Sequence, residues 1–245
     1  MPITISTGSC HDLKLKGNDA IKFLLDYDID GIELCFAYQK DLIEFELDGE
    51  LQQELLKKDF NSIHMPSRDF NYSNNKESIK TLHKADKLAK QINAKYIVFH
   101  PSEINDFKIL NQLKTQVAIE NLHRDDKQYS TFESIKETLD KYSFLKLVFD
   151  TDHAFISKND FDKYLTLKDD IIGIHACSQW IRKRDNKEKS HGFIQEADNK
   201  QLELYTPFFK LRKPIMIEAD FYPEKKELIG KEIELLKKLS QKSTF

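Results

Sequence analysis

The sequence contains little glycine and proline, with 7 and 6 of these residues among 245. No stretch rich in glycine, proline or serine interrupts it, and it has no low-complexity block. Such stretches mark the linkers between domains, so their absence favours one domain over residues 1–245. Hydrophobic residues make up 40% of the chain, which is enough to fill one sizeable core.

Long apolar segments are also missing. No window approaches the ~18 uninterrupted apolar residues that a membrane span needs. The N-terminal residues MPITISTGSCHDLK contain no basic segment followed by an apolar one, as a signal peptide would. We therefore expect a cytoplasmic protein with no membrane partner.

Cysteine is scarce, since Cys10, Cys35 and Cys177 lie far apart and form no CxxC pair. This pattern argues against a disulfide framework and against a zinc site made of thiolates, so we expect plain thiols. An excess of positive charge is missing as well, because the net charge is −3. Without a global basic field, a nucleic-acid partner requires a local basic patch.

Short apolar runs rich in β-branched residues alternate eight times with segments of helical periodicity, such as Lys76–Ile92, Thr131–Tyr142 and Glu224–Gln241. This alternation predicts an α/β fold, a single closed (β/α)₈ TIM barrel; an open doubly wound sheet is the alternative. Neither GxGxxG nor GxxxxGK[ST] is present, which argues against a nucleotide cradle. The eight runs are Ile3–Gly8, Gly31–Phe36, Ser62–Pro66, Lys95–Pro101, Gln116–Leu122, Lys146–His153, Ile171–Ser178 and Pro214–Phe221.

Polar residues recur near the C-terminal ends of six of these runs. Side chains alternate across a strand, so each of these residues shares a face with the residue two positions earlier. The intervening residues are mostly apolar and suited to lie under a helix, which places the polar series inside the barrel. Barrel enzymes assemble their active sites at this end of the strands. The six residues are His64, His100, Glu120, Asp150, His175 and Glu218.

Seven of the eight histidines lie at or after strand ends, and only His83 lies within a helical pattern. Imidazoles gathered with carboxylates form a ligand set for zinc, manganese or ferrous iron. A glutamate can bridge two such ions, so the sequence predicts a site for two to three divalent ions, with zinc first. His11 and His123 are expected to make hydrogen bonds near the site, and Glu33 to have a structural role.

Two predicted loops combine basic and aromatic residues. The loop after the third strand contains Arg68 and Tyr72, and the long loop after the seventh contains Trp180 among basic residues that include Arg182, Arg184 and Lys189. This combination suits phosphate contact together with stacking on a base or sugar. A solvated lid is the alternative. We therefore expect a phosphate-bearing substrate, DNA or a sugar phosphate.

Several short segments resemble a known family. FDTDHAF, IHMP, VFHPS and SHGFIQEA are similar to motifs of the xylose isomerase-like barrel superfamily, and most of all to those of endonuclease IV, which cuts DNA at abasic sites. In SHGFIQEA, His191 and Glu196 match the motif H-x-x-I-G-E-G, whereas Gln195 and Ala197 replace glycines. The resemblance extends from Ile3 to about Leu239 and implies a barrel enzyme with a trinuclear metal site.

The resemblance also implies roles for individual residues. His64, His100 and Glu120 would hold one ion; Glu120, Asp150, His175 and Glu218 a second; and His153 and His191 a third. His153 could instead be a general acid/base. Two positions depart from the family: Asp152 stands where cysteine is usual, and Lys189 replaces an aspartate ligand of the third ion. The third ion either loses a ligand, borrows Asp185 or Asp152, or is not bound.

Two main functions follow from these residues. The first is metal-dependent phosphodiester hydrolysis, with Glu120 as bridging ligand and base. The alternative is a sugar or sugar-phosphate isomerase or epimerase, in which Glu120 and Glu218 move a proton beside one ion. The imidazoles of His64, His100 and His191 favour the first, since a mononuclear isomerase has no use for the two on the third and fourth strands. Oxidative chemistry at a ferrous site shares the same ligands.

Overall fold

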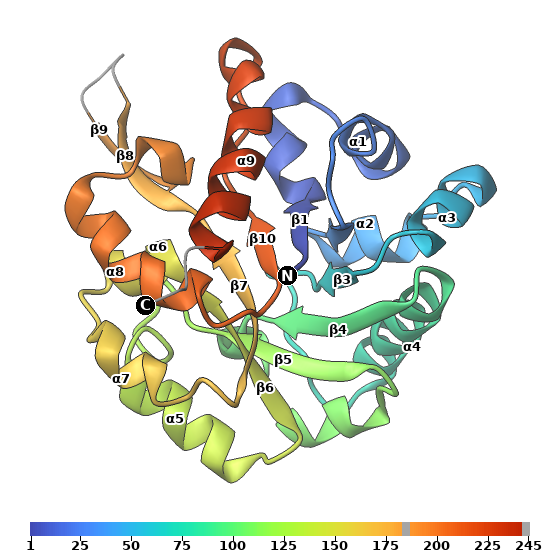
Figure 1. Cartoon of the computed structure of the whole chain (residues 1–245). Coiled ribbons are helices and arrows are strands. Elements are labelled where there is room, and N and C mark those ends of the chain that lie inside the picture. Colours follow the sequence, from blue (N-terminus) through green and yellow to red (C-terminus); the bar gives the residue numbers. More distant parts are fainter. Residues whose placement is uncertain (183–186, 242–245) are drawn as a thin grey trace.

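Eight parallel strands close into a barrel in the computed structural model, which describes residues 1–182 and 187–241. The spatial order is β1-β10-β7-β6-β5-β4-β3-β2, with β1 paired to both β2 and β10 (Figure 1). The predicted (β/α)₈ barrel is confirmed. Its strands are β1 Ile3–Ser6, β2 Gly31–Cys35, β3 Asn61–His64, β4 Ala94–Phe99, β5 Gln116–Glu120, β6 Leu145–Asp150, β7 Ile171–Ala176 and β10 Ile215–Ile217.

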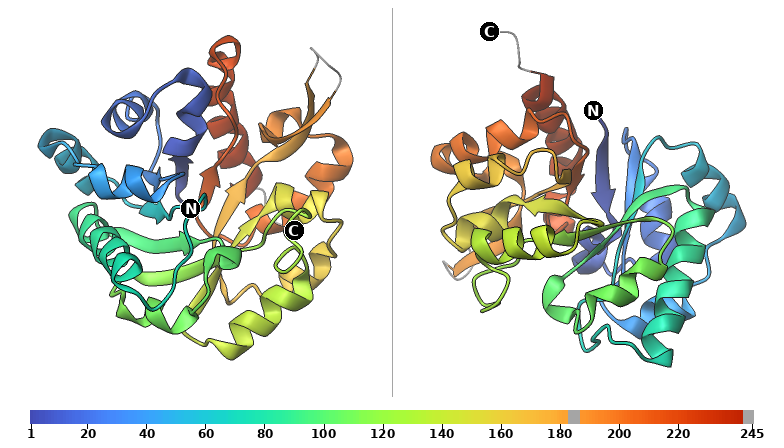
Figure 2. Two further views of the ribbon diagram at one scale, coloured as in Figure 1. Left: turned by 180° about the vertical axis from the view of Figure 1, so that it is seen from behind. Right: turned by 90° about the horizontal axis from the view of Figure 1, so that it is seen from below.

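Helices surround the strands on the outside of the barrel (Figures 1 and 2). Within the described residues, no helix combines the length and apolar character needed to cross a membrane. The α-helices are α1 Gly17–Leu24, α2 Gln39–Glu44, α3 Gly49–Leu56, α4 Lys76–Gln91, α5 Phe132–Lys141, α6 Thr151–Ile156, α7 Phe161–Leu165, α8 Asn199–Phe209 and α9 Glu227–Gln241. Short 3-10 helices are η1 Thr7–Leu13, η2 Pro101–Glu103, η3 Phe107–Gln112, η4 Ile194–Glu196 and η5 Pro223–Lys225.

Side-chain caps fix the starts of the predicted helices. Asn75 Oδ1 accepts a hydrogen bond from the Ser78 backbone N–H at 2.8 Å and begins α4, and Thr131 caps α5 in the same way. The predicted helix over residues 224–241 begins later than expected, at Glu227. The residues before it form η5, in which proline occupies the first turn.

Two apolar layers fill the barrel and its surroundings. The larger one lies between strands and helices, and a smaller cluster of Tyr96, Val98, Ala118 and Val148 fills the barrel interior. A Cβ atom added at Gly173 would lie 2.5 Å from Tyr96 Oη, so this strand position requires glycine. The apolar interior cluster confirms the predicted alternation, in which these positions point inward below the polar ones.

The segment after β7 differs from the expected long loop. It forms an antiparallel hairpin of β8 Ser178–Arg182 and β9 Lys187–Gly192, which projects from the barrel (upper left of Figure 1). The sixth strand is also shorter than the predicted Lys146–His153, because α6 begins at Thr151. Both differences lie at the C-terminal end of the barrel and shape the site there.

Candidate metal centre

Six contiguous strands, β3 to β7 and β10, bring their polar end residues to one mouth of the barrel. A cavity of about 910 Å³ opens from this mouth. Of the residues predicted as metal ligands, those that line the cavity are His64, His100, His153, His191 and Glu218.

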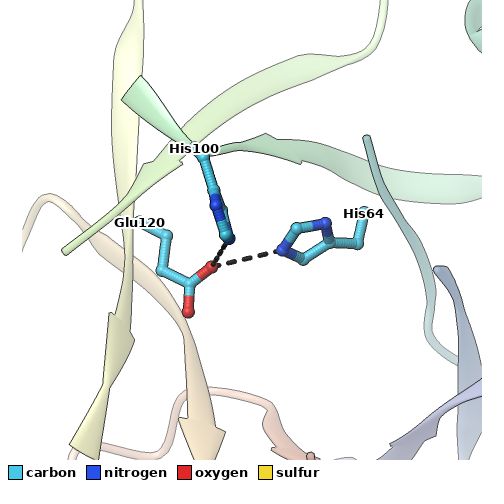
Figure 3. A group of neighbouring side chains, drawn as sticks. All are labelled: His64, His100 and Glu120. Atoms are coloured by element: carbon cyan, nitrogen blue, oxygen red, sulfur yellow. Dashed lines mark hydrogen bonds and ion pairs between the residues drawn. The ribbon is translucent and has the colours of Figure 1, made fainter. Parts of the chain in front are cut away.

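Glu120 is the centre of this cluster. Its Oε2 atom lies 3.2 Å from His64 Nε2 and 3.4 Å from His100 Nε2, and both rings point at it (Figure 3). Its other oxygen, Oε1, lies 3.1 Å from His175 Nδ1. The carboxylate is 1% exposed. One buried glutamate therefore directs one oxygen to each of two ligand groups, as a bridging ligand would.

The second ligand group lies deeper in the barrel. Ligand atoms of Glu120, Asp150, His175 and Glu218 all lie within 4.8 Å of one another. His175 Nδ1 lies 2.9 Å from Glu218 Oε2, which is buried. Oxygen and nitrogen donors at this spacing suit one divalent ion.

The segment FDTDHAF positions Asp150 and His153 through a helix start. Asp150 is the N-cap of α6, and its Oδ1 atom accepts a hydrogen bond from the His153 backbone N–H at 2.6 Å. The His153 ring nitrogen Nδ1 lies 3.0 Å from the carbonyl oxygen of Asn121, to which it donates. Nε2 of His153 can then bind a metal ion or exchange a proton with a substrate.

Glu33 contacts the opposite side of His175. Its Oε2 atom accepts a hydrogen bond from Ser62 Oγ at 2.9 Å, and its Oε1 atom lies 3.5 Å from His175 Nε2. All three side chains are buried. This arrangement directs Nδ1 of His175 toward Glu120 and Glu218, because the N–H at Nε2 faces a carboxylate.

The protonation of the cluster reflects a shortage of positive charge. Burial alone would raise the pKa of Glu120, but neighbouring imidazoles, first that of His175, hold it well below its usual value. Burial and the charges of Glu120 and Glu218 raise the pKa of Asp150 well above its usual value. Burial alone would lower the pKa of His64, but Glu120 raises it to about 9. Divalent cations would supply the charge that protons supply here, so the donor set fits metal ions.

A third ligand group differs from the one expected. Ligand atoms of Cys177, His191 and Glu218 lie within 4.8 Å of one another. His153 belongs to none of the ligand groups found among the described residues, although its ring centroid lies 5.8 Å from that of His191. Cys177 is a free thiol, as expected, but its position beside His191 and Glu218 was not predicted.

Asp152 and Asp185 were the two acids expected as possible ligands of the third ion. Asp152 is fully buried, and its Oδ2 atom accepts hydrogen bonds from Ser190 Oγ and from the His191 backbone N–H. It therefore fastens the end of β9 and so positions His191. Asp185 lies outside the described residues.

Of the two predicted substrate-binding residues after the third strand, only one lines the cavity. Arg68 is exposed and lines it. Tyr72 does not: it is 1% exposed and its hydroxyl donates to the Pro66 carbonyl at 3.1 Å, so the prediction of a rim position was wrong. The Tyr72 ring packs instead against core aromatic rings, and its centroid lies 5.1 Å from that of Phe99.

The hairpin residues are also placed away from the cavity lining. Trp180 is covered by Lys225, whose Nζ lies 3.6 Å from the ring centroid, and Lys189 is paired with Trp180 across the hairpin. Neither residue is among those that line the cavity. Arg182 ends β8, but its side chain lies outside the described part of the structure, as does the whole of Arg184.

Residues of the first two βα loops also line the cavity, and they were not identified from the sequence. They include Asp12, Lys16, Tyr38, Asp41 and Phe45. Their position directly after β1 and β2 was the available signal, since every loop at this end of a barrel can reach the mouth. No spacing pattern in the sequence separates them from solvated loop residues.

The fold is a TIM barrel, which this chain shares with solved enzymes of several kinds, among them a xylose isomerase domain protein from Planctomyces limnophilus. No protein-family model and no curated protein matches the sequence. Among solved structures, endonuclease IV, sugar epimerases and a dehydratase share the fold.

Three structures illustrate this similarity. A probable 3-DHS dehydratase from Bacillus anthracis is 16% identical with a TM-score of 0.73, over 97% of this chain and 99% of that one. A Thermus thermophilus protein soaked with ZnCl2 is 16% identical with a TM-score of 0.66, over all of both chains. Endonuclease IV from Thermus thermophilus is 14% identical with a TM-score of 0.64, over 99% of this chain and 100% of that one. Identities this low establish a fold but no reaction.

Proposed function

We propose that the chain is a divalent-metal-dependent hydrolase that cleaves phosphodiester bonds, with chemistry similar to that of endonuclease IV at abasic sites. The observation that carries this proposal is the position of Glu120, with one oxygen at His64 and His100 and the other at His175. An isomerase with a single ion needs only the second ligand group. The two imidazoles on β3 and after β4 gain a purpose when a second ion is bound.

Both ligand groups would hold their ions through residues of the barrel mouth. His64, His100 and Glu120 would hold one ion, and Glu120, Asp150, His175 and Glu218 the other. Imidazole with carboxylate favours zinc, and manganese or ferrous iron also fit such donors. When bound, a pair of divalent ions lowers the pKa of a water nucleophile and offsets the charge of the phosphate and of the leaving oxygen.

Other residues of the chain would handle protons and the substrate. His153 lines the cavity with Nδ1 donating to Asn121, so its Nε2 can give a proton to, or take one from, a bound group. Arg68 lines the cavity beside Tyr38, to which it is paired by a backbone bridge. Tyr38 is 43% exposed. A guanidinium and an exposed ring at the same cavity suit a phosphate followed by a base or sugar.

A sugar isomerase or epimerase is the second candidate, and the acidic side of the cavity favours it. Asp12, Asp41, Glu44 and Asp220 line the same cavity as Arg68. Carboxylates accept hydrogen bonds from sugar hydroxyls and repel phosphate. In this reading the second ligand group would act with one ion, and Glu120 and Glu218 would move the proton.

The test is a pair of assays on one preparation. A duplex with a single abasic analogue is incubated with the protein in zinc and in manganese, beside sugar phosphates followed for isomerisation. We expect nicking at the abasic site that falls by roughly 100-fold in His64→Ala and is kept in His83→Ala, which changes an exposed histidine of α4. Isomerised sugar with intact DNA would replace this proposal with the second candidate.

A further inference from the structure

Cys177 is held at the barrel mouth with its thiol among the metal ligands. The residue directly follows β7 and is fully buried. Thr151 fixes its backbone, since Thr151 Oγ1 donates to the Cys177 carbonyl at 2.7 Å and accepts from the Cys177 N–H at 3.3 Å. The Sγ atom lies 3.3 Å from Asp150 Oδ2. The thiol therefore faces the carboxylate cluster and not the apolar core.

His191 is fixed beside this thiol by three backbone contacts. Its N–H donates to Asp152 Oδ2 at 3.2 Å, its carbonyl accepts from the Asp220 N–H at 2.8 Å, and its ring Nδ1 lies 3.2 Å from the Glu218 carbonyl. The residue adopts a φ of 56°, a left-handed conformation that is uncommon outside glycine. Local strain of this kind persists where the surrounding structure imposes it.

We infer that Cys177, His191 and Glu218 form a third divalent-metal site, and that Glu218 serves both this site and the second ligand group. Ligand atoms of the three residues lie within 4.8 Å of one another. Donors around one zinc ion are about 3.5 Å apart, given bond lengths of about 2.0–2.3 Å, so the ligand atoms would have to approach one another by up to about 1.3 Å. The inference rests on the metal-dependent site proposed above and not on its reaction.

The carboxylates around the thiol support a cation at this position. The Cys177 Sγ atom lies 3.3 Å from Asp150 Oδ2, and Glu218 belongs to the same ligand group. A metal ion would displace the thiol proton to solvent and bind the thiolate, as metal sites made of cysteine do. The third site would then differ in ligand type from the first two and would favour zinc over manganese or magnesium.

The residues around His191 position it for this site. Asp152, where the family has cysteine, holds the backbone of His191 and so positions the second ligand. His153 is then free to act on substrate protons.

Cobalt(II) reports on a thiolate ligand directly, because sulfur bound to cobalt gives an intense near-ultraviolet charge-transfer band. Metal-free full-length protein, reduced and kept under anaerobic conditions, is titrated with cobalt(II). We expect visible d–d bands from the first equivalents and a charge-transfer band that grows with the third. Cys177→Ser and His191→Ala should each lose that band and bind about one ion fewer. Cys35→Ala, which changes the thiol at the end of β2, should keep it.

The outcomes separate the inference from the proposed function. Cobalt bound with d–d bands but no charge-transfer band in the unmodified protein overturns the third site and leaves the hydrolase proposal standing. No bound cobalt at all overturns both. A band that survives in Cys177→Ser and disappears in Cys35→Ala also overturns the inference, because another thiol is then the ligand. The unmodified protein alone decides the first two outcomes, whether or not a variant folds.

Discussion

The two sides of Glu120 differ in charge and in access to solvent. On one side His64 and His100 offer two imidazoles, and the His100 side chain is 25% exposed at the cavity. On the other side Asp150 and His175 are fully buried and Glu218 adds another carboxylate. A site with three carboxylates holds a cation more tightly than one with two imidazoles and a shared oxygen. We therefore expect a tightly held inner ion and an outer ion that is easier to remove.

The largest effect is expected from Glu120→Gln, which changes the one ligand common to both sides. The amide keeps the shape but removes the charge and one acceptor, so both ions should be weakened together. Changes in residues behind a ligand already cost 10–100-fold, so we expect turnover to fall by well over ~100-fold. Element analysis and the cleavage assay measure the two losses. A variant that retains two ions and full turnover would show that Glu120 is not a bridge.

Removal of one outer imidazole should separate the two sides. His64→Ala or His100→Ala is expected to lower the metal content by one ion, leave the inner ion in place and reduce activity by roughly 100-fold. His83→Ala is the matched control, because it removes an exposed imidazole from α4. An unchanged metal content in both variants would show that these two imidazoles hold no ion and would favour the isomerase.

A smaller and one-sided effect is expected from Glu33→Gln. Glu33 lies 3.5 Å from His175 and affects His64 only through its charge, so the change should weaken the inner ion by roughly 10–100-fold and the outer one much less. Competition with a chromophoric chelator measures the two affinities. Ser62→Ala, which removes the hydrogen bond to Glu33, should act in the same direction and less strongly. Equal weakening of both ions would contradict a positioning role for Glu33.

Chelation should lower the thermal stability of the protein. Ions that bind only the folded chain stabilise it by about 2.7 kcal/mol at a concentration 100 times Kd. The midpoint of unfolding should therefore fall on addition of chelator and fall less in Glu120→Gln, which starts with fewer ions. An equal fall of the unfolding midpoint in both proteins would show that the chelator removes an ion that Glu120 does not bind.

The barrel and most of the ligand cluster were predictable because they depend on local periodicity. Val98, Ala118 and Val148 point inward two residues before His100, Glu120 and Asp150, and a strand admits no other arrangement of alternate side chains. The inward position of Glu33 followed from the same rule, but its contact with His175 did not, because β2 and β7 lie far apart in the sequence.

Other parts of the site depend on contacts between loops, which no local pattern encodes. The hairpin β8–β9 consists of short polar strands that lack alternating hydrophobic residues, so its sequence resembles that of a solvated loop. Cys177 becomes a candidate ligand only because Thr151 fixes its backbone and β9 returns His191 to the same place. Tyr72 was misplaced because its basic neighbourhood suggested a surface ring, whereas the ring packs in the core.

The smallest effect on the metal centre is expected at Glu232, a buried carboxylate of α9 that is satisfied by N–H donors in place of cations. It accepts hydrogen bonds from the backbone N–H groups of Ile194 at 2.5 Å and Gln195 at 3.1 Å, and from Gln195 Nε2 at 3.3 Å. Burial raises the pKa of Glu232 to about 7 from 4.5, and these hydrogen bonds offset the shift only in part.

Because the folded state favours the protonated form of Glu232, its contribution to stability is complete below pH 4.5 and is lost as the pH rises through about 7. A shift of this size corresponds to about 3 kcal/mol. Between pH 4.5 and 8, the metal-free protein should therefore lose up to about 3 kcal/mol of unfolding free energy that Glu232→Gln does not lose. Urea unfolding of both proteins in chelator measures the difference, and element analysis of the metal-loaded forms should give equal ion contents. Parallel pH profiles would show that the three N–H donors keep Glu232 ionised throughout. In that case buried carboxylates in this barrel would be satisfied equally well by N–H groups, and the excess of carboxylates at the mouth would no longer argue for cations.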